Sequence, residues 1–506
     1  MTAPDAYAAL VTDAKELAVL QSCAAVLGWD QQTYMPKGGG AFRGDQLGLL
    51  AKLCHAKATD PAVGERLAAV AASDLVSDPE SVVSANIREW RHGYDRATKL
   101  PARLVEELAR VTTAAQGAWV EAKGKSDFAT FRPHLEKIVA LKREEAAALS
   151  SGGTGFQAGD ALYDALLDEY EPGCATAELR PLFASLTAEL VPFIKALGDA
   201  GKKPDESVLR REFPVDRQKW FAEGIAAAFG FDFTAGRLDT TSHPFCSAFG
   251  PGDCRLTTRY NPRFFSECFF GVLHEAGHGM YEQGLPADLF GTPCGAYCSL
   301  GVHESQSRFW ENLIGRSRAF WDHTFPRLQQ AFPGTLTGVT ADRWHFAVNA
   351  VKPSLIRVEA DEATYNLHIA IRFELELALI GGELAVADLP GAWADKYESF
   401  LGIRPTTDAE GCLQDIHWSF GGFGYFPTYT LGNLHAAHYF AHMPDPTDAI
   451  RRGEFRDVLG WLRTNVHAHG RRFRSGELTR RATGTPLTAA AFSKSLTGKL
   501  GELYGV

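Results

Sequence analysis

Hydrophobic residues recur at helical spacing along most of the chain. From residue 1 to about residue 230, and again beyond residue 304, apolar positions follow an i, i+3, i+4 pattern, which predicts helix after helix. The pattern changes at 231–260, where Thr, Phe, Gly and Pro are frequent and Gly250-Pro251-Gly252-Asp253 is typical of a turn. We interpret this stretch as a small antiparallel β-sheet. The sequence therefore predicts a mainly α-helical fold with one small sheet.

The stretch after the predicted sheet combines an apolar helical face with paired histidines. Apolar residues recur at helical spacing in 264–284, and Gly284 ends the predicted helix. Within it, His274-Glu275-Ala276-Gly277-His278 is an H-E-x-x-H motif, whose two histidines are four residues apart and share one face. Two such imidazoles can hold one Zn²⁺ at about 2.0–2.1 Å. Glu275 lies about 100° around the helix from His274, where it can act as a general base on a water at the metal.

A hydrolytic zinc site needs a third protein ligand. His303-Glu304-Ser305-Gln306 begins the next predicted helix, and a loop rich in Pro and Gly separates it from His278. Two histidines, a glutamate and one open position are the ligand set of a hydrolytic zinc site. Taken alone, Glu304 is better explained as a glutamate at a helix start, where the helix dipole favours a carboxylate. Beside H-E-x-x-H, we favour Glu304 as the third metal ligand.

Composition and charge exclude several functional classes. The chain has 506 residues, enough for one large domain or two lobes, and its net charge is −10 without a long basic run. We therefore expect no nucleic-acid or anionic-membrane partner. No apolar run reaches the roughly 18 residues that span a bilayer, and acidic Asp5 and Asp13 argue against a signal peptide. Nine scattered cysteines, an odd number, indicate a reducing cytoplasm.

Two further regions carry candidates for substrate contact. His243, within the predicted sheet region, can reach a substrate backbone or can serve only as a turn histidine. The stretch 413–433 places His417, Tyr425 and Tyr429 among several glycines. Such a loop suits oxyanion stabilisation and substrate positioning, although ordinary aromatic packing explains the same residues equally well.

A long charged helix is predicted to begin at Pro353 and to end at Gly381-Gly382. Pairs at i, i+4 such as Arg357–Asp361 explain its charges as a solvated face. The opposite face is apolar enough for burial, and a buried arginine usually has a carboxylate partner. The residues leave both readings open.

Motifs along nearly the whole chain resemble those of the carboxypeptidase Taq family of zinc metallocarboxypeptidases. Their order along the chain matches the family's, which makes the resemblance specific. The motifs are WDQQTYMP at 29–36 with Arg43 and Gln46, His243-Pro244-Phe245, the D-x-R-x-T pattern at 253–257, H-E-x-x-H at 274–278, HESQ at 303–306, IRVEADE at 356–362 and GYFPTY at 424–429.

The resemblance implies a fold and an activity. The expected fold is a helical zincin similar to neurolysin and angiotensin-converting enzyme, a single peptidase domain over residues 1–506 with two helical lobes around a deep central groove. The expected activity is the release of single C-terminal amino acids from peptides with broad specificity. Zinc is the expected metal, with cobalt able to substitute, and the expected assembly is a homodimer.

The resemblance also assigns roles to the candidate residues. His274, His278 and Glu304 are expected as metal ligands, and Glu275 as the base that activates a zinc-bound water. By analogy with the wider helical peptidase clan, His243 and His417 hold the substrate backbone, and Tyr425 or Tyr429 stabilises the oxyanion. Arg308 stands four residues after Glu304, where related clans have an aspartate that orients a ligand histidine. The partner of His274 therefore stays unassigned.

A carboxypeptidase must also recognise the free α-carboxylate of its substrate. An arginine fork matches this planar anion better than lysine does. We favour Arg357, which lies in one of the family motifs, with Arg259 as the second choice. Two alternatives to the predicted metallocarboxypeptidase remain at this point. One is an endo-oligopeptidase of the same fold, and the other is a catalytically silent interaction scaffold.

Overall fold

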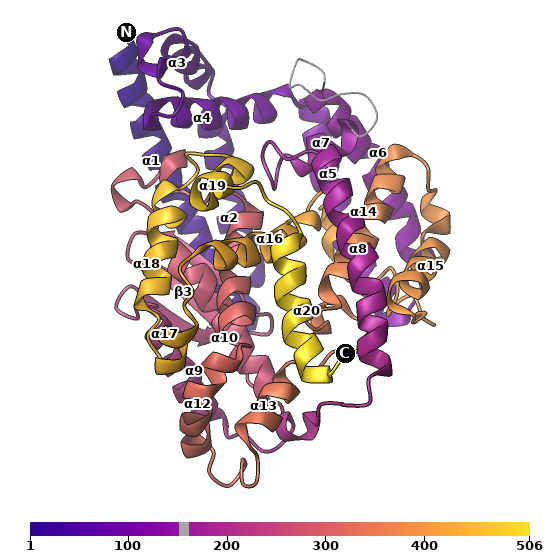
Figure 1. Ribbon diagram of the computed structural model, residues 1–506. Helices are drawn as coiled ribbons and strands as arrows, with labels where there is room; N and C mark the ends of the chain where they lie inside the picture. The colour runs from indigo at the N-terminus through magenta and orange to yellow at the C-terminus, as the bar shows by residue number, and fades with distance from the viewer. Residues whose placement is uncertain (151–160) are drawn as a thin grey trace. The chain divides into compact units, whose positions relative to one another are not determined.

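The chain is helical over most of its length in a computed structural model, which describes residues 1–150 and 161–506. It divides into two compact units, each built from three separate segments. Unit 1 comprises Met1–Thr98, Asp205–Val348 and His435–Leu487, and unit 2 comprises Lys99–Pro204, Asn349–Leu434 and Thr488–Val506. The long helix α16 (Pro427–His442) belongs in part to each unit. The predicted succession of helices is confirmed (Figure 1).

Unit 1 contains the sheet and the H-E-x-x-H helix. Its other helices come from the start, the middle and the end of the chain. They are α1 (Ala3–Thr33), α2 (Gly40–Ala58), α3 (Pro61–Ala71), α4 (Val82–Lys99), α9 (Val215–Phe229), α10 (Phe265–Glu282), α11 (Leu300–Arg308), α12 (Arg318–Ala331), α13 (Ala341–Val348), α17 (Thr447–Arg452), α18 (Arg456–Asn465) and α19 (Ser475–Thr483).

Unit 2 is helical throughout the part of it that the structure describes. Its helices are α5 (Ala102–Lys125), α6 (Phe128–Ser150), α7 (Ala161–Leu167), α8 (Thr176–Asp199), α14 (Tyr365–Gly381), α15 (Leu389–Leu401) and α20 (Ala490–Tyr504). By length and mean hydropathy alone, α8 could cross a membrane. Its buried residues, such as Leu179, Phe183, Leu186 and Leu190, recur three or four positions apart. This spacing is typical of a helix that packs one face on a protein core.

The sheet of unit 1 has three strands in the order β1-β3-β2. They are β1 (Gly236–Thr240), β2 (Cys246–Gly250) and β3 (Asp253–Thr258). The prediction of an antiparallel sheet is correct for β2 and β3, which form a hairpin, but wrong for β1, which pairs parallel to β3. The segment between β1 and β2 places β1 on the far side of β3. Strand periodicity does not reveal this crossing, because alternation along a strand is the same for either direction of its neighbour.

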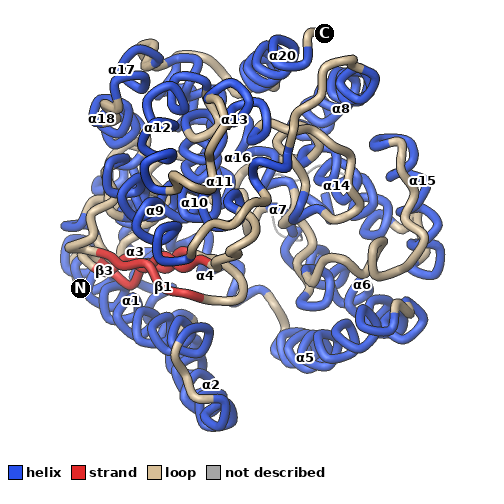
Figure 2. The backbone as a smooth tube through the Cα atoms, turned by 90° about the horizontal axis from the view of Figure 1, so that it is seen from below, coloured by secondary structure: helices blue, strands red, loops and turns tan. Residues whose placement is uncertain are grey.

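The sheet lies between the H-E-x-x-H helix and the N-terminal helix. On β3, buried Cys254 and Leu256 alternate with Arg255, whose guanidinium lies 4.4 Å from the centre of the Trp29 ring of α1. The other face meets α10, because the Leu256 side chain approaches Gly279. Figure 2 shows the strands beside α1. The apolar positions that predicted α10, including Phe265 and Phe269, are buried in the core of unit 1.

The predicted helix from Pro353 is wrong over residues 353–364. Residues 357–359 form a single 3-10 turn, and α14 begins only at Tyr365. Asp361 accepts hydrogen bonds from the backbone N–H groups of Lys352, Ala363 and Thr364, which fixes a turn before the helix. The charged residues before 365 therefore lie in a loop rather than on a helical face. The predicted end at Gly381-Gly382 is confirmed, since Gly382 caps α14 with φ +90°.

Candidate metal centre

The three predicted metal ligands lie together in unit 1. His274 and His278 project from α10, and Glu304 projects from α11. The Glu304 Oε2 atom lies 3.7 Å from His274 Nε2 and 3.4 Å from His278 Nε2. These three residues form the one group of candidate metal-binding side chains found among residues 1–150 and 161–506, and their ligand atoms lie within 4.8 Å of one another.

The geometry of this group fits a divalent metal ion. Tetrahedral zinc with bonds of about 2.0–2.1 Å separates its ligand atoms by roughly 3.3 Å, close to the two distances from Glu304. Both imidazoles also have Nε2 available for a metal, because their Nδ1 atoms are hydrogen-bonded to other groups. Burial lowers the pKa of His278 to about 3, which keeps its Nε2 lone pair free for a metal at neutral pH.

Glu311 is the partner of His274 that sequence reasoning left unassigned. Its Oε2 atom lies 2.9 Å from His274 Nδ1, and it follows Arg308 in a short π-helix, Phe309–Ile314. Burial alone would raise the pKa of Glu311, but Arg308, His274 and Arg316 outweigh burial and lower it to about 2. An ionised carboxylate on Nδ1 fixes the tautomer of a ligand histidine. The signal was present in the sequence, because Glu311 lies two helical turns after Glu304.

The second ligand histidine is held by a different partner. His278 Nδ1 lies 3.0 Å from the backbone oxygen of His303 and 2.7 Å from the Nδ1 atom of the same residue. His303 Nε2 in turn lies 2.9 Å from Glu282 Oε1. With His278 donating from Nδ1, His303 accepts at its own Nδ1 and donates from Nε2 to Glu282. Two carboxylates, Glu311 and Glu282, thus support the two ligand histidines.

A glycine allows the two ligand-bearing helices to approach closely. A Cβ atom at Gly277 would lie 2.4 Å from the backbone oxygen of Gln306 and 2.7 Å from the Cα atom of Ser307. The helices α10 and α11 are therefore in backbone contact between the two histidines and Glu304. The element that approaches α10 at Gly277 is thus the helix α11.

Glu275 is buried beside the candidate metal site, with 6% of its surface exposed. Burial raises the pKa of its carboxyl group to about 7. A carboxylate with such a pKa can both accept and return a proton near neutrality. Its environment is therefore compatible with the predicted base.

The two other predicted residues of unit 1 lie in and near the sheet. His243 is exposed in the segment between β1 and β2. Arg259, just after β3, lies 2.5 Å from Glu267 in the first turn of α10 and donates to the backbone oxygen of Ser242. Its side chain keeps 48% of its surface exposed, so it has room for a further anion.

The remaining predicted residues form a second cluster, within unit 2. His417 Nε2 lies 3.4 Å from the hydroxyl oxygen of Tyr429, and the rings of His417 and Tyr425 are 5.2 Å apart. His417 is almost fully buried, and burial lowers its pKa to about 4. Both tyrosines are partly exposed. The predicted loop thus brings one neutral imidazole together with two accessible phenols.

Arg357 belongs to this cluster, with partners other than the one considered from the sequence. Its guanidinium lies 2.8 Å from Asp415 and donates to the Tyr365 hydroxyl at 3.0 Å. Asp415 also binds Arg372 at 2.6 Å. Pairing of Arg357 with Asp361 is therefore wrong, because residues 357–361 do not form the α-helix that would bring the two side chains together. Two guanidinium groups share one carboxylate, which leaves one net positive charge in this buried group.

A buried carboxylate on α14 anchors the glycine-rich loop. Glu376 accepts hydrogen bonds from the Tyr163 hydroxyl, the Trp418 indole and the backbone N–H of Gly424, at 2.8, 2.8 and 3.0 Å. Gly424 has φ +87°, and a Cβ atom there would lie 2.7 Å from the backbone of Leu167. Sequence reasoning missed Glu376, because these partners are distant along the chain.

Comparisons with known proteins agree over the full chain. The model of the family described as Carboxypeptidase Taq (M32) metallopeptidase matches residues 9–500. Thermostable carboxypeptidase 1 of Thermus thermophilus is 49% identical over 511 residues, which cover 100% of both chains. Carboxypeptidase 1 of Bacillus subtilis is 38% identical and covers 97% of both chains.

Comparison with a solved structure supports the same family fold. The M32 carboxypeptidase of Deinococcus radiodurans R1 is 42% identical, with a TM-score of 0.94 over 99% of this chain and 100% of that chain. Sequence and structure comparisons thus agree on a helical metallocarboxypeptidase, as the motifs at 274–278 and 303–306 predicted. The chain belongs to the Carboxypeptidase Taq (M32) metallopeptidase family.

Proposed function

We propose that this metallocarboxypeptidase releases single C-terminal amino acids from peptides, with broad specificity, at the centre formed by His274, His278 and Glu304. The observation that carries the proposal is the convergence of these three side chains from two helices, with Glu275 buried beside them. Family membership implies a divalent metal. The two imidazoles and one carboxylate suit zinc, and cobalt prefers similar ligands.

Each residue of this centre has a defined role. His274, His278 and Glu304 hold the metal, while Glu311 and His303 orient the two histidines through their Nδ1 atoms. When bound, the metal supplies Lewis acidity toward the scissile carbonyl and the attacking water. Glu275 takes the proton of that water and returns it to the leaving amine, which its pKa of about 7 favours.

The residues outside this centre act on the substrate rather than on the metal. We assign His417 and one of Tyr425 and Tyr429 to the developing oxyanion, since a neutral imidazole N–H or a phenol donates a hydrogen bond without carrying charge. His243 holds the substrate backbone, and its exposure leaves it accessible. Arg357 binds the terminal carboxylate, supported by the net positive charge of its buried group. Arg259 is the alternative.

The products of peptide digestion test this function. Incubation of the zinc-loaded enzyme with one peptide of about ten residues, followed by mass spectrometry, should show successive loss of single C-terminal residues. Removal of the metal with a chelator should stop the reaction, and added zinc should restore it. Internal fragments would favour an endo-oligopeptidase, and a metal-loaded protein that releases nothing would favour a silent scaffold. The family and the complete ligand set speak against both.

We further propose a homodimer in a reducing cytoplasm, without nucleic-acid or membrane partners. None of the residues of α2 is buried, and Phe42, Leu49 and Leu53 are 69%, 59% and 45% exposed. Their spacing of seven and four places them on one face, which a second copy can cover. All nine cysteines are free thiols, which supports the proposed reducing compartment.

Light scattering tests the dimer. The protein should have about twice the 55.1 kDa mass of one chain, and Leu49→Glu should reduce the mass to that of a monomer. A 55 kDa particle at micromolar concentration would contradict the assignment.

A further inference from the structure

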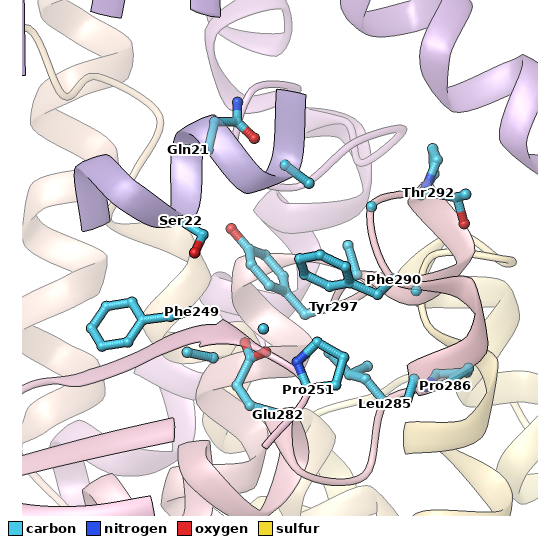
Figure 3. A pocket seen from close by; sticks show the side chains of 18 of the residues that line it. Gln21, Ser22, Phe249, Pro251, Glu282, Leu285, Pro286, Phe290, Thr292 and Tyr297 are labelled. Atoms are coloured by element: carbon cyan, nitrogen blue, oxygen red, sulfur yellow. The ribbon is translucent and has the colours of Figure 1, made fainter. Parts of the chain in front are cut away.

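A cavity of about 560 Å³ lies within unit 1, lined by none of the three candidate metal ligands (Figure 3). Its walls come from α1, from the turn between β2 and β3, from the C-terminal end of α10 and from the loop at 285–297. Of the described residues that line it, Glu282 alone carries a charge. A side chain of a substrate or a small molecule fits a space of this size.

Glu282 presents one free carboxylate oxygen to this cavity. Its Oε1 atom accepts a hydrogen bond from His303 at 2.9 Å, which leaves Oε2 for a ligand. In Figure 3 the carboxylate points from the floor into the space between Phe249 and Tyr297. Its position is fixed by α10 and by the bond to His303, so it does not need to reorganise when a cation binds.

Aromatic rings surround the carboxylate. Phe249, Phe290 and Tyr297 line the cavity close to Glu282 (Figure 3), and Trp90 contributes from α4. Aromatic faces attract cations, and they also cover an aliphatic stem. A carboxylate at the end of an apolar, aromatic-walled space is complementary to a cation on an apolar stem. A neutral or anionic group would leave the charge of Glu282 partly desolvated, with only the hydrogen bond from His303 to compensate it.

The cavity also lies along the same helix face as the metal ligands. Glu282 is four residues after His278, just as His278 is four residues after His274, so each step advances about 6 Å along one face of α10. An extended peptide advances about 3.3–3.6 Å per residue. Glu282 therefore lies about 12 Å along the helix from His274, a distance that an extended peptide covers in about three to four residues.

We propose that this cavity is a binding site for a guanidinium or alkylammonium group carried on an apolar stem, with Glu282 as its counter-ion. Two sources supply such a group, namely a basic side chain of the peptide substrate and a free small-molecule cation. The assignment to a substrate side chain rests on the proposed function, whereas the binding site itself does not.

Direct binding to the zinc-loaded full-length protein tests the site. The probes are n-butylguanidinium and its neutral isostere n-butylurea, measured by calorimetry or by ligand-observed NMR. We expect n-butylguanidinium to bind at least tenfold more tightly than n-butylurea. Glu282→Gln keeps an acceptor for the His303 N–H and removes the charge, so it should abolish this preference. Asp288→Asn is the matched control, because Asp288 is exposed near the cavity without lining it, and it should retain the preference.

A second variant tests the cavity without changing Glu282, so its result does not depend on any structural effect of Glu282→Gln. Ala18→Trp fills the cavity from α1 and leaves Glu282 and His303 in place, so it should abolish binding of n-butylguanidinium while the protein keeps its zinc. Equal binding of the two probes to the wild type would overturn the proposal. Unchanged preference in Glu282→Gln, or unchanged binding in Ala18→Trp, would overturn it as well.

Peptide kinetics distinguish the two sources of the cation. Peptides with arginine or citrulline at the last, second-last or third-last position are compared as pairs. If a substrate side chain occupies the cavity, the arginine-to-citrulline ratio of kcat/KM at one position falls at least tenfold in Glu282→Gln. A ratio unchanged at all three positions, together with intact probe binding, assigns the cavity to a free cation. Failure to release amino acids at all would count against the proposed function and would leave the binding result standing.

Discussion

At the residue scale, the candidate metal centre is organised by the hydrogen bonds that its two histidines make at Nδ1, on the side of the ring away from the metal position. His274 and His278 each turn Nε2 toward Glu304 because Nδ1 is already bound, to Glu311 and to His303 respectively. These partners are carboxylate and backbone groups that hold one tautomer. Preorganisation of this kind reduces the cost of assembling a metal site during folding.

The proposed contact of Arg357 with the terminal carboxylate of the substrate gives a testable prediction. Arg357→Ala should lower kcat/KM for peptides with a free C-terminal carboxylate by about 10²-fold, the size expected for loss of a charge-assisted contact. Hydrolysis of C-terminally amidated peptides should change little, because they lack the anion. The local fold should be retained, since Asp415 keeps its contact with Arg372, and zinc content should be unchanged, since Arg357 is not one of the candidate metal ligands.

A paired substrate series distinguishes recognition from structure. Each peptide is measured with a free and an amidated C-terminus, together with the melting temperature of the variant. Equal losses on both substrates would remove Arg357 from the carboxylate site. The corresponding test would then apply to Arg259, whose exposed side chain makes it the alternative.

At the scale of elements, the contact between α10 and α11 sets the distance between the histidines and Glu304. Gly277→Ala places a methyl group against the backbone of Gln306 and Ser307, which cannot move aside as a side chain can. We expect the helices to separate and zinc affinity to fall at least tenfold, with a loss of stability of about 1–3 kcal/mol.

Gly271→Ala is the matched control for this prediction. It lies on the same helix, where the added methyl meets only Thr258 Oγ1 at 3.8 Å. Alanine is favoured over glycine in a helix by about 1 kcal/mol, so this variant should be slightly stabilised and should keep its zinc. Competition with a chromophoric chelator measures both affinities. Normal zinc affinity in Gly277→Ala would show that the helix contact does not set the ligand geometry.

The loop anchored by Glu376 gives a prediction about pH. Burial raises the pKa of Glu376 to about 7, from a usual value of 4.5. Between these two values the unfolded chain is ionised while the folded protein keeps the proton, so the free energy of unfolding falls as pH rises. The fall from this residue amounts to at most about 3 kcal/mol and is complete above pH 7.

Urea denaturation of the metal-free protein from pH 4.5 to 7.5 measures this contribution. In Glu376→Gln, the decline in stability across this window should be smaller than in the wild type, because glutamine does not titrate. The comparison of slopes removes the effect of every other titrating group. Parallel pH profiles would mean that Glu376 does not titrate in this range in the folded protein.

At the scale of the whole molecule, sequence reasoning succeeded where interactions are local. Helical spacing predicted α10, and spacing within one helix placed His274 and His278 on a common face. It failed where distant segments meet. The parallel pairing of β1 depends on a crossing over β3, and Glu376 meets Tyr163 from 213 residues away. The periodicity of one element carries no information about such partners.

The family motifs supplied part of the information about the site that the periodicity of single elements lacks. They supported Glu304 as the third candidate ligand, which its position beside H-E-x-x-H also favoured, although Glu304 taken alone is better explained by an ordinary helix start. They did not identify Glu311 or Glu282, which support the ligand histidines. Helical spacing after Glu304 points to Glu311, but its contact with His274 and the contact of Glu282 with His303 depend on how α10 and α11 pack.

The central claim is that a metal held by His274, His278 and Glu304, with Glu275 as base, releases C-terminal amino acids. The most direct test measures metal content and amino-acid release together in the wild type, Glu275→Gln and His274→Ala. We predict that Glu275→Gln keeps about one zinc per chain and loses about 10³-fold in turnover, within the range for loss of a general base. His274→Ala should lose both zinc and activity. Near-normal turnover in Glu275→Gln, or full zinc in His274→Ala, would contradict the account.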